Sequence, residues 1–103
     1  MLKLTFYVPL DYKDIVKDAL FEVGAGKIGA NDRCSFEVLG SGQFRPLIGA
    51  NPSIGKIGSI EKIIEARVEM VFDDTIMEEV ISVLKRSHPY ETPAFDIMRC
   101  MDL

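Results

Sequence analysis

The sequence predicts an α+β fold made of two successive β-α-β units. Two segments alternate apolar and polar residues with the period of a strand, an amphipathic helical pattern follows each of them, and a further strand follows each helix. At 103 residues the chain has the length of one domain, spanning 1–103. This order is that of the ferredoxin-like βαββαβ motif. We therefore expect a four-stranded antiparallel sheet of order 4-1-3-2 with two helices on one face, and with strands one and three central and parallel.

The first unit begins with a strand over residues 2–8, whose core-facing side chains are Leu2, Leu4, Phe6 and Val8. Pro9 ends this strand, and Asp11 is placed to cap the helix that follows. The helix has an apolar stripe of Ile15, Ala19, Leu20 and Val23. Gly24 and Gly26 then predict a left-handed helix end.

The second strand is expected over residues 33–39, with Cys34, Phe36 and Val38 alternating on its core side. Gly40-Ser41-Gly42 predicts a turn, and residues 43–47 a short returning arm. The glycine-rich stretch 49–58 completes a hairpin and loop insertion at about 40–60. A loop of this length inside a small domain indicates a functional or interacting segment.

The second unit begins with the clearest strand, over residues 63–72, and continues with a helix for which Asp74 is the expected cap. The apolar stripe of that helix is Ile76, Val80, Val83 and Leu84. A last strand is expected over 93–101, where mixed faces leave the register open. Cys34 and Cys100 would then lie on opposite edge strands, about 14 Å apart. Because a disulfide needs Cα atoms within about 7 Å, we expect no bond between them.

Composition excludes several classes of function. The net charge of −4, without a cluster of basic residues, argues against nucleic-acid binding. No apolar run reaches the roughly 20 residues of a membrane span, and the alternating N-terminal segment is not that of a signal peptide. Two cysteines are too few for a disulfide framework, so we expect a cytoplasmic protein.

One face of the sheet is expected to lack helices. The alternation predicts that it presents Lys3, Thr5, Tyr7, Ser35, Glu37, Leu39, Glu65, Arg67 and Glu69. One interpretation is a solvated surface of ion pairs. The other is a subunit interface that uses Tyr7, Leu39 and part of the last strand.

The stretch from His88 to Asp96 holds the only histidine and links the last helix to the last strand. His88 and Glu91 can begin a site for a transition or divalent metal ion, although structural zinc needs four ligands. The simpler reading has His88 at the negative end of the helix dipole, Pro89 stopping the helix, and Tyr90 packing. Cys34 with His88 can also form a nucleophile and its base, against the alternative of a small buried apolar cysteine.

Several motifs together resemble the YqfO-type domain, an insert in many bacterial proteins of the NGG-interacting-factor-three family. They are Gly26-Lys27-Ile28-Gly29, Cys34-Ser35-Phe36, Gly40-Ser41-Gly42-Gln43-Phe44-Arg45-Pro46-Leu47, Gly49-Ala50-Asn51-Pro52, and His88-Pro89-Tyr90-Glu91 with Ala94-Phe95-Asp96. The resemblance implies a fold like those of the PII signalling protein and CutA, which assemble as trimers. It also implies that the sequence corresponds to the insert alone, without the histidine-rich dinuclear metal domain of larger members, so their suggested hydrolase-like activity is not transferred.

From these observations we expect a self-associating module, a trimer or dimer, that binds a small ligand or a protein partner and is not an enzyme. The residues expected to line its cleft are His88, Tyr90, Glu91, Arg45 and Asn51. No cofactor is expected beyond a possible divalent metal ion. The alternatives are a metal-binding protein centred on His88 and Glu91 and, third, a thiol-dependent enzyme that uses Cys34.

Overall fold

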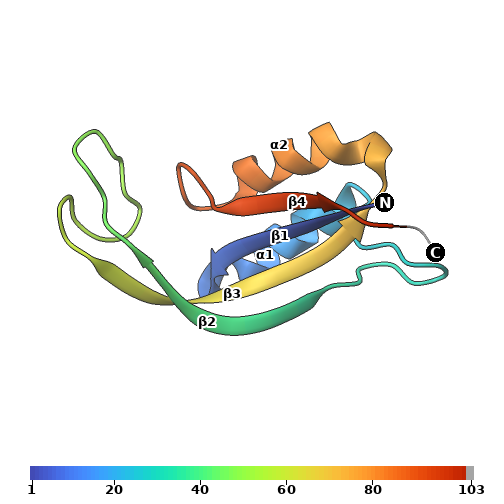
Figure 1. Ribbon diagram of the computed structural model, residues 1–103, viewed down its shortest axis with the longest axis horizontal. Coiled ribbons are helices and arrows are strands. Elements are labelled where there is room, and N and C mark those ends of the chain that lie inside the picture. The colour runs from blue at the N-terminus through green and yellow to red at the C-terminus, as the bar shows by residue number, and fades with distance from the viewer. Residues whose placement is uncertain (102–103) are drawn as a thin grey trace.

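The computed structural model describes residues 1–101, and its sheet has the order predicted from the sequence. The strands lie in the order β2-β3-β1-β4, which is 4-1-3-2 read from the other edge. The elements along the chain are β1 (Leu2–Pro9), α1 (Leu10–Glu22), β2 (Phe36–Phe44), β3 (Glu61–Phe72), the 3-10 turn η1 (Asp74–Ile76), α2 (Met77–Ser87) and β4 (Phe95–Arg99) (Figure 1).

Every neighbouring pair of strands is antiparallel, so the expectation that β1 and β3 run parallel is wrong. In the register of this central pair Leu2 lies opposite Phe72 and Val8 lies opposite Ala66. The reason is the connection between them. The crossover through α1 returns β2 in the direction of β1, and the hairpin after β2 then reverses the chain into β3.

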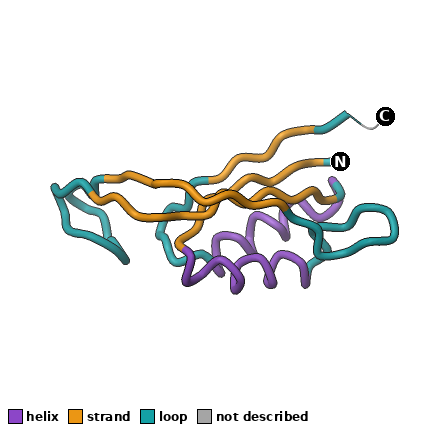
Figure 2. Tube along the Cα trace, turned by 90° about the horizontal axis from the view of Figure 1, so that it is seen from below, coloured by secondary structure: helices purple, strands orange, loops and turns teal. Residues whose placement is uncertain are grey.

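Both helices lie against the same side of the sheet, and the core fills the space between the two layers (Figure 2). The predicted inward faces of β1 and α2 are confirmed, because their apolar residues are buried apart from a half-buried Ile76. On α1 the stripe is shifted. Val16 and Leu20 are fully buried, whereas Ile15 is 60% exposed.

Strand β2 faces the opposite way from the prediction. Residues directly opposite each other in an antiparallel pair share a face. Glu37 lies opposite Val68, which is fully buried beneath the helices, so Glu37 projects toward the helices. Phe36 and Val38 therefore project from the open face, the side of the sheet that the helices leave uncovered. The prediction that they point into the core together with Cys34 is wrong.

Ion pairs to α1 accompany this orientation of β2. The carboxylate of Glu37 lies 2.6 Å from the ammonium of Lys13 and 2.7 Å from that of Lys17. Hydrogen bonds from these two lysines hold the pKa of Glu37 below its ordinary value. Alternation alone puts an apolar residue inside, but here an acidic residue bridges the edge strand to the helix. Glu37 and Leu39 consequently leave the predicted open face.

The open face carries both ion pairs and exposed apolar side chains. Lys3 and Arg67 each approach the carboxylate of Glu69 to 3.5 Å, which gives it an ion-paired centre. The register places four large exposed apolar or aromatic side chains around that centre: Tyr7, Phe36, Val38 and Met98.

Strands β2 and β3 form a long arm that extends beyond the helices (Figures 1 and 2). Gly40-Ser41-Gly42 is not a turn, because β2 continues through it to Phe44, which lies opposite Glu61 at the start of β3. The predicted returning strand over 43–47 is therefore absent from the structure. We call residues 39–64 the arm. It gives the molecule a length of 46 Å against 25 and 24 Å in the other directions.

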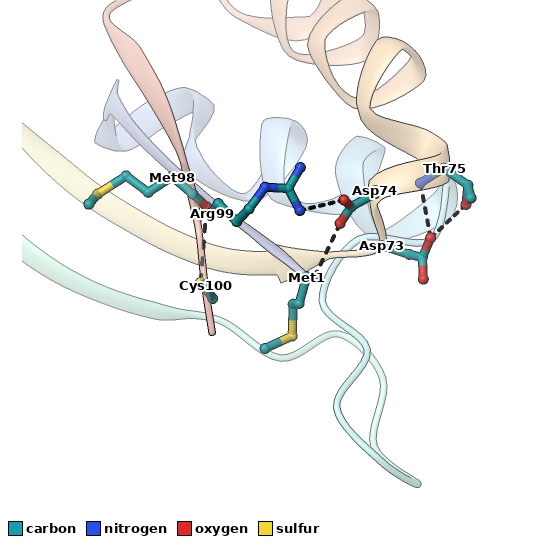
Figure 3. A network of polar contacts seen from close by, with 7 residues as sticks. All are labelled: Met1, Asp73, Asp74, Thr75, Met98, Arg99 and Cys100. Carbon is teal, nitrogen blue, oxygen red and sulfur yellow. Dashed lines mark hydrogen bonds and ion pairs between the residues drawn. The ribbon is translucent and has the colours of Figure 1, made fainter. Parts of the chain in front are cut away.

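The helix ends differ from the predicted caps. Pro9 precedes α1 without a side-chain cap, and Asp11 lies in the first turn. Asp73, not Asp74, caps the start of the second helical segment by accepting from the backbone N–H and the hydroxyl of Thr75 (Figure 3). The end of α1 is as predicted, with Gly24 at φ +105° and Gly26 at +84°.

Asp74 instead ties the helical layer to the sheet. Its carboxylate accepts from the guanidinium of Arg99 at 2.6 Å and lies 3.1 Å from the terminal amine of Met1 (Figure 3). Both cysteines are free thiols, Cys34 ahead of β2 and Cys100 just after β4, at opposite edges of the sheet. None of the helices described is long and apolar enough to cross a bilayer.

Candidate ligand pocket at the base of the arm

A cavity of about 500 Å³ lies where β1 ends and the arm begins. Three parts of the chain form its walls: Tyr7 and Glu65 from the central strands, residues 43–47 and 50–54 from the arm, and residues 90–92 with Ala94 ahead of β4. We call this cavity the arm pocket. Its volume lies within the range of small-molecule sites, and most of its walls are apolar or aromatic with a few polar groups, as such sites require.

Four of the five residues predicted to line a cleft do line the arm pocket: Arg45, Asn51, Tyr90 and Glu91. They come from segments nearly forty residues apart in sequence. The fifth, His88, does not line the cavity. It lies behind Tyr90, with the two ring centroids 4.9 Å apart.

His88 is a structural residue in this fold. It is 6% exposed, and its Nε2 lies 2.7 Å from the backbone carbonyl oxygen of Tyr7, to which it donates. Its Nδ1 accepts from the backbone N–H of Tyr90 at 3.0 Å. These two bonds require a neutral imidazole with its proton on Nε2. Burial lowers the pKa of the imidazole, which also favours the neutral form. His88 thus fastens the segment after α2 to β1 and sets the position of Tyr90.

This bonding bears on the metal-site hypothesis for His88 and Glu91. Both ring nitrogens of His88 are used by main-chain groups, so a metal ligand role requires one of those bonds to break. Glu91 is exposed at the pocket wall. Within residues 1–101, no three His, Cys, Asp or Glu side chains gather as a metal site would need.

Tyr90 is the centre of the pocket wall. Its hydroxyl donates to Oε2 of Glu65 at 3.4 Å, and its ring lies 5.9 Å from that of Phe44 with a tilt of 55°. Burial and the neighbouring carboxylate together raise the pKa of the Tyr90 hydroxyl, which therefore stays protonated as a donor. Burial likewise raises the pKa of Glu65, against the opposing effect of the hydrogen bond from Tyr90.

Gly42 makes room for Glu65. A Cβ on Gly42 would overlap the carboxylate of Glu65, whereas a Cβ on Gly40, two residues earlier in the same strand, would meet open space. Glu65, Phe44 and Tyr7 line the cavity but were not predicted from the sequence as residues of the ligand site. The signal available in the sequence was the position of Gly40-Ser41-Gly42 between two strand-like segments. A strand that continues through these residues lengthens the hairpin and brings side chains of β3 beside the glycine-rich loop.

The glycine-rich loop is held by its own backbone. The N–H of Gly58 donates to the carbonyl of Pro46 at 2.7 Å, and that of Ala50 donates to Leu47 at 3.0 Å. Gly55 has φ +87° and lies against Glu61, where a Cβ would collide with that side chain. Arg45 is exposed on this loop, and its guanidinium has no hydrogen bond or ion pair among the described residues.

Cys34 is far less enclosed than a core cysteine. It is half-buried in the loop before β2, its N–H donates to the carbonyl of Gly26 at 2.8 Å, and its Sγ lies 3.6 Å from the carbonyl oxygen of Asp32. The view of Cys34 as a small residue buried in phase with β2 is therefore wrong. Because His88 is buried with both ring nitrogens bonded to main-chain groups, neither is free to act as the base for this thiol.

Curated relatives of this chain are much longer proteins. One from Mycobacterium leprae (strain TN), named GTP cyclohydrolase 1 type 2 homolog, is 48% identical over 95 residues, which are 92% of this chain and 25% of the relative. One of the same name from Bacillus subtilis (strain 168) is 45% identical over 95 residues, 92% of this chain and 26% of the relative. The chain thus spans about a quarter of the length of the curated relatives it matches. No family model matches the sequence.

Solved structures agree with the fold. A Bacillus cereus protein related to NIF3 superposes with a TM-score of 0.79 at 32% identity, covering 93% of this chain and 24% of that protein. CutA1 from Pyrococcus horikoshii superposes with a TM-score of 0.72 at 17% identity, covering all of this chain and 86% of its own. The second likeness, at its low identity, is one of fold alone.

Proposed function

Because the chain is a homologue of the PII/CutA-like insert region of NIF3-family proteins, we propose that it is a self-associating module that binds a small ligand in the arm pocket. We propose no enzymatic activity for it, and a cytoplasmic location. The observation that carries the ligand proposal is the cavity of about 500 Å³, because it gathers Arg45, Asn51, Tyr90 and Glu91 from separate segments. The activity in the relatives' names concerns proteins about four times as long and is not part of this proposal.

The geometry of the pocket supports a binding role. The bonds of His88 to Tyr7 and Tyr90 fix two residues that line the cavity, so the Tyr90 wall is preorganised and a ligand need not order it. The glycine-rich loop of the arm also lines the cavity, and its backbone hydrogen bonds hold it closed on itself. Hydrophobic walls with a few convergent polar groups are the usual composition of a small-molecule site.

A thermal-shift screen of small metabolites against the purified chain tests the ligand proposal. A ligand at a hundred times its dissociation constant should raise the unfolding free energy by about 2.7 kcal/mol. The shift should be lost in Asn51→Ala and Tyr90→Ala and kept in Arg86→Ala, an exposed control on α2 outside the pocket. Hits that are equally strong in all of these variants would refute binding at the pocket.

Self-association is proposed for the open face. Phe36 is 65% exposed and Met98 58% exposed there. The family resemblance implies trimers, and we propose a trimer or a dimer. Light scattering after gel filtration should give a dimer or trimer mass for the wild type. Phe36→Ser should reduce that mass, while Ile15→Ser, at a 60% exposed position on α1, should not. A monomer at all concentrations would end this part of the proposal.

A further inference from the structure

The arm pocket contains a carboxylate without a cationic partner. Glu65 is half-buried, and its hydrogen bond from Tyr90, at 3.4 Å, is longer than a strong O–H···O contact. No lysine or arginine within residues 1–101 pairs with it, in contrast to Glu69 on the same strand, which has two such partners. A half-buried carboxylate is stabilised in its charged form by an opposite charge nearby. The pocket therefore has a place that a cation would stabilise.

Aromatic rings lie beside that carboxylate. Tyr90 touches Glu65 through its hydroxyl and packs at 5.9 Å against the ring of Phe44, and Tyr7 lines the same cavity. The faces of such rings attract cations, and the attraction is largest where water is excluded. The remaining walls include Pro46, Leu47 and Ile54, which suit an apolar body and not a small hydrated ion.

The backbone also leaves space for the carboxylate. Gly42 has no side chain at the point where the Glu65 carboxylate approaches β2, so the acid can lie against this strand beside the cavity that it lines. Any larger residue at position 42 would force that carboxylate away. A glycine inside a strand commonly marks such a close approach.

We infer, on the basis of the proposed ligand-binding function, that the arm pocket recognises an organic cation: a protonated amine carried on an apolar or aromatic body. The ammonium group lies beside Glu65, and the body packs against Phe44 and Tyr90. Glu91 adds a second carboxylate at the wall. Arg45 lines the same cavity and is the group that an anionic ligand would use, so it defines the competing outcome.

Three probes of matched shape test this inference on the wild-type chain at pH 7.5: phenethylammonium, 2-phenylethanol and 3-phenylpropionate. Binding is followed by amide chemical shifts in two-dimensional NMR. We expect phenethylammonium to shift the resonances of the pocket segments and to bind at least tenfold more tightly than the neutral alcohol. Glu65→Gln should remove this preference, and Glu69→Gln, on the same face of β3 but outside the pocket, should keep it.

The wild-type ranking needs no variant, so it holds even if Glu65→Gln folds poorly. Equal binding of amine and alcohol, or an amine preference that survives Glu65→Gln, would overturn the inference. Tighter binding of 3-phenylpropionate, lost in Arg45→Ala, would also overturn it while leaving the arm pocket as a ligand site. If no probe shifts a pocket resonance and the metabolite screen finds no pocket-dependent hit, the proposed function itself fails.

Discussion

The body of the sheet and its arm share strands β2 and β3 but are stabilised differently. In the body, Leu4, Phe6 and Val8 are fully buried beneath two helices. In the arm, the side chains of Leu39 and Ile64 point to the same side of the sheet as those of the body residues. They lie beyond the helices, however, and each is 63% exposed. The body is therefore held by side-chain packing, and the arm mostly by backbone pairing and loop turns, with Phe44 packed on Tyr90 at its base. This difference leaves the arm free to form a pocket without weakening the core.

The first way to break this comparison is to remove the same side chain from each region. Leu4 is fully buried in the body, and Leu39 is 63% exposed in the arm. Leu4→Ala should lower the unfolding free energy by about 2–5 kcal/mol, since it leaves a cavity in the core. Leu39→Ala should change it by about 0.5 kcal/mol or less in the isolated subunit.

Urea denaturation at a protein concentration where the chain is monomeric measures both variants. If Leu39→Ala costs as much as Leu4→Ala under those conditions, Leu39 is packed in the subunit and the distinction between the two regions is wrong.

The second prediction concerns His88, which fastens the segment after α2 to β1 and sets the position of Tyr90 against Phe44 of the arm. His88→Ala leaves the carbonyl of Tyr7 and the N–H of Tyr90 without their partner, so it should cost about 1–3 kcal/mol at pH 8. Burial holds the folded-state pKa of His88 below its ordinary value of 6.5, so the unfolded chain takes up the proton first as the pH falls. The contribution of His88 is thus complete above about pH 6.5 and is lost as the pH falls through the folded-state pKa.

Denaturation of wild type and His88→Ala at pH 8, 7, 6 and 5 gives the test, because the difference between them isolates this residue. The raised pKa of Glu65 has the opposite effect on stability, because this group favours the folded state as the pH falls. The lowered pKa values of Glu37, Asp73 and Asp74 reduce stability only at more acidic pH. A difference that stays constant from pH 8 to pH 5 would contradict a buried neutral His88.

The third prediction has the smallest effect on stability and concerns the pocket alone. Gly42→Ala places a methyl group on the carboxylate of Glu65, the end of a flexible side chain, so the loss of stability should stay below about 1 kcal/mol. Binding of phenethylammonium should nevertheless weaken, because the acid is displaced from the cavity. Gly40→Ala is the matched control, since nothing lies within 4 Å of its added Cβ.

NMR titration of both glycine variants measures this effect. Equal affinities for Gly42→Ala and Gly40→Ala would show that the position of Glu65 does not matter for the ligand. A loss of stability well above about 1 kcal/mol in Gly42→Ala alone would show that the Glu65 side chain cannot move aside.

The sequence by itself determined the order of the elements and the packed side of the body. Residues 2–8 and 63–72 alternate over a full strand length, and the stripe on α2 is regular, so local periodicity was enough. The sequence also pointed to Arg45, Asn51, Tyr90 and Glu91, which do line one cavity. They were grouped because the segments that carry them are distinctive, since the sequence gives no distances between them.

Only the tertiary structure decided the orientation of β2 and the composition of the pocket. The face that an edge strand presents depends on its register with β3 and on the ion pairs of Glu37 with Lys13 and Lys17, and both are long-range. The pocket joins Tyr7, Phe44, Glu65 and Tyr90, which no local pattern relates. The physical reason is that periodicity records which residues alternate, whereas pairing across the sheet sets which side they take.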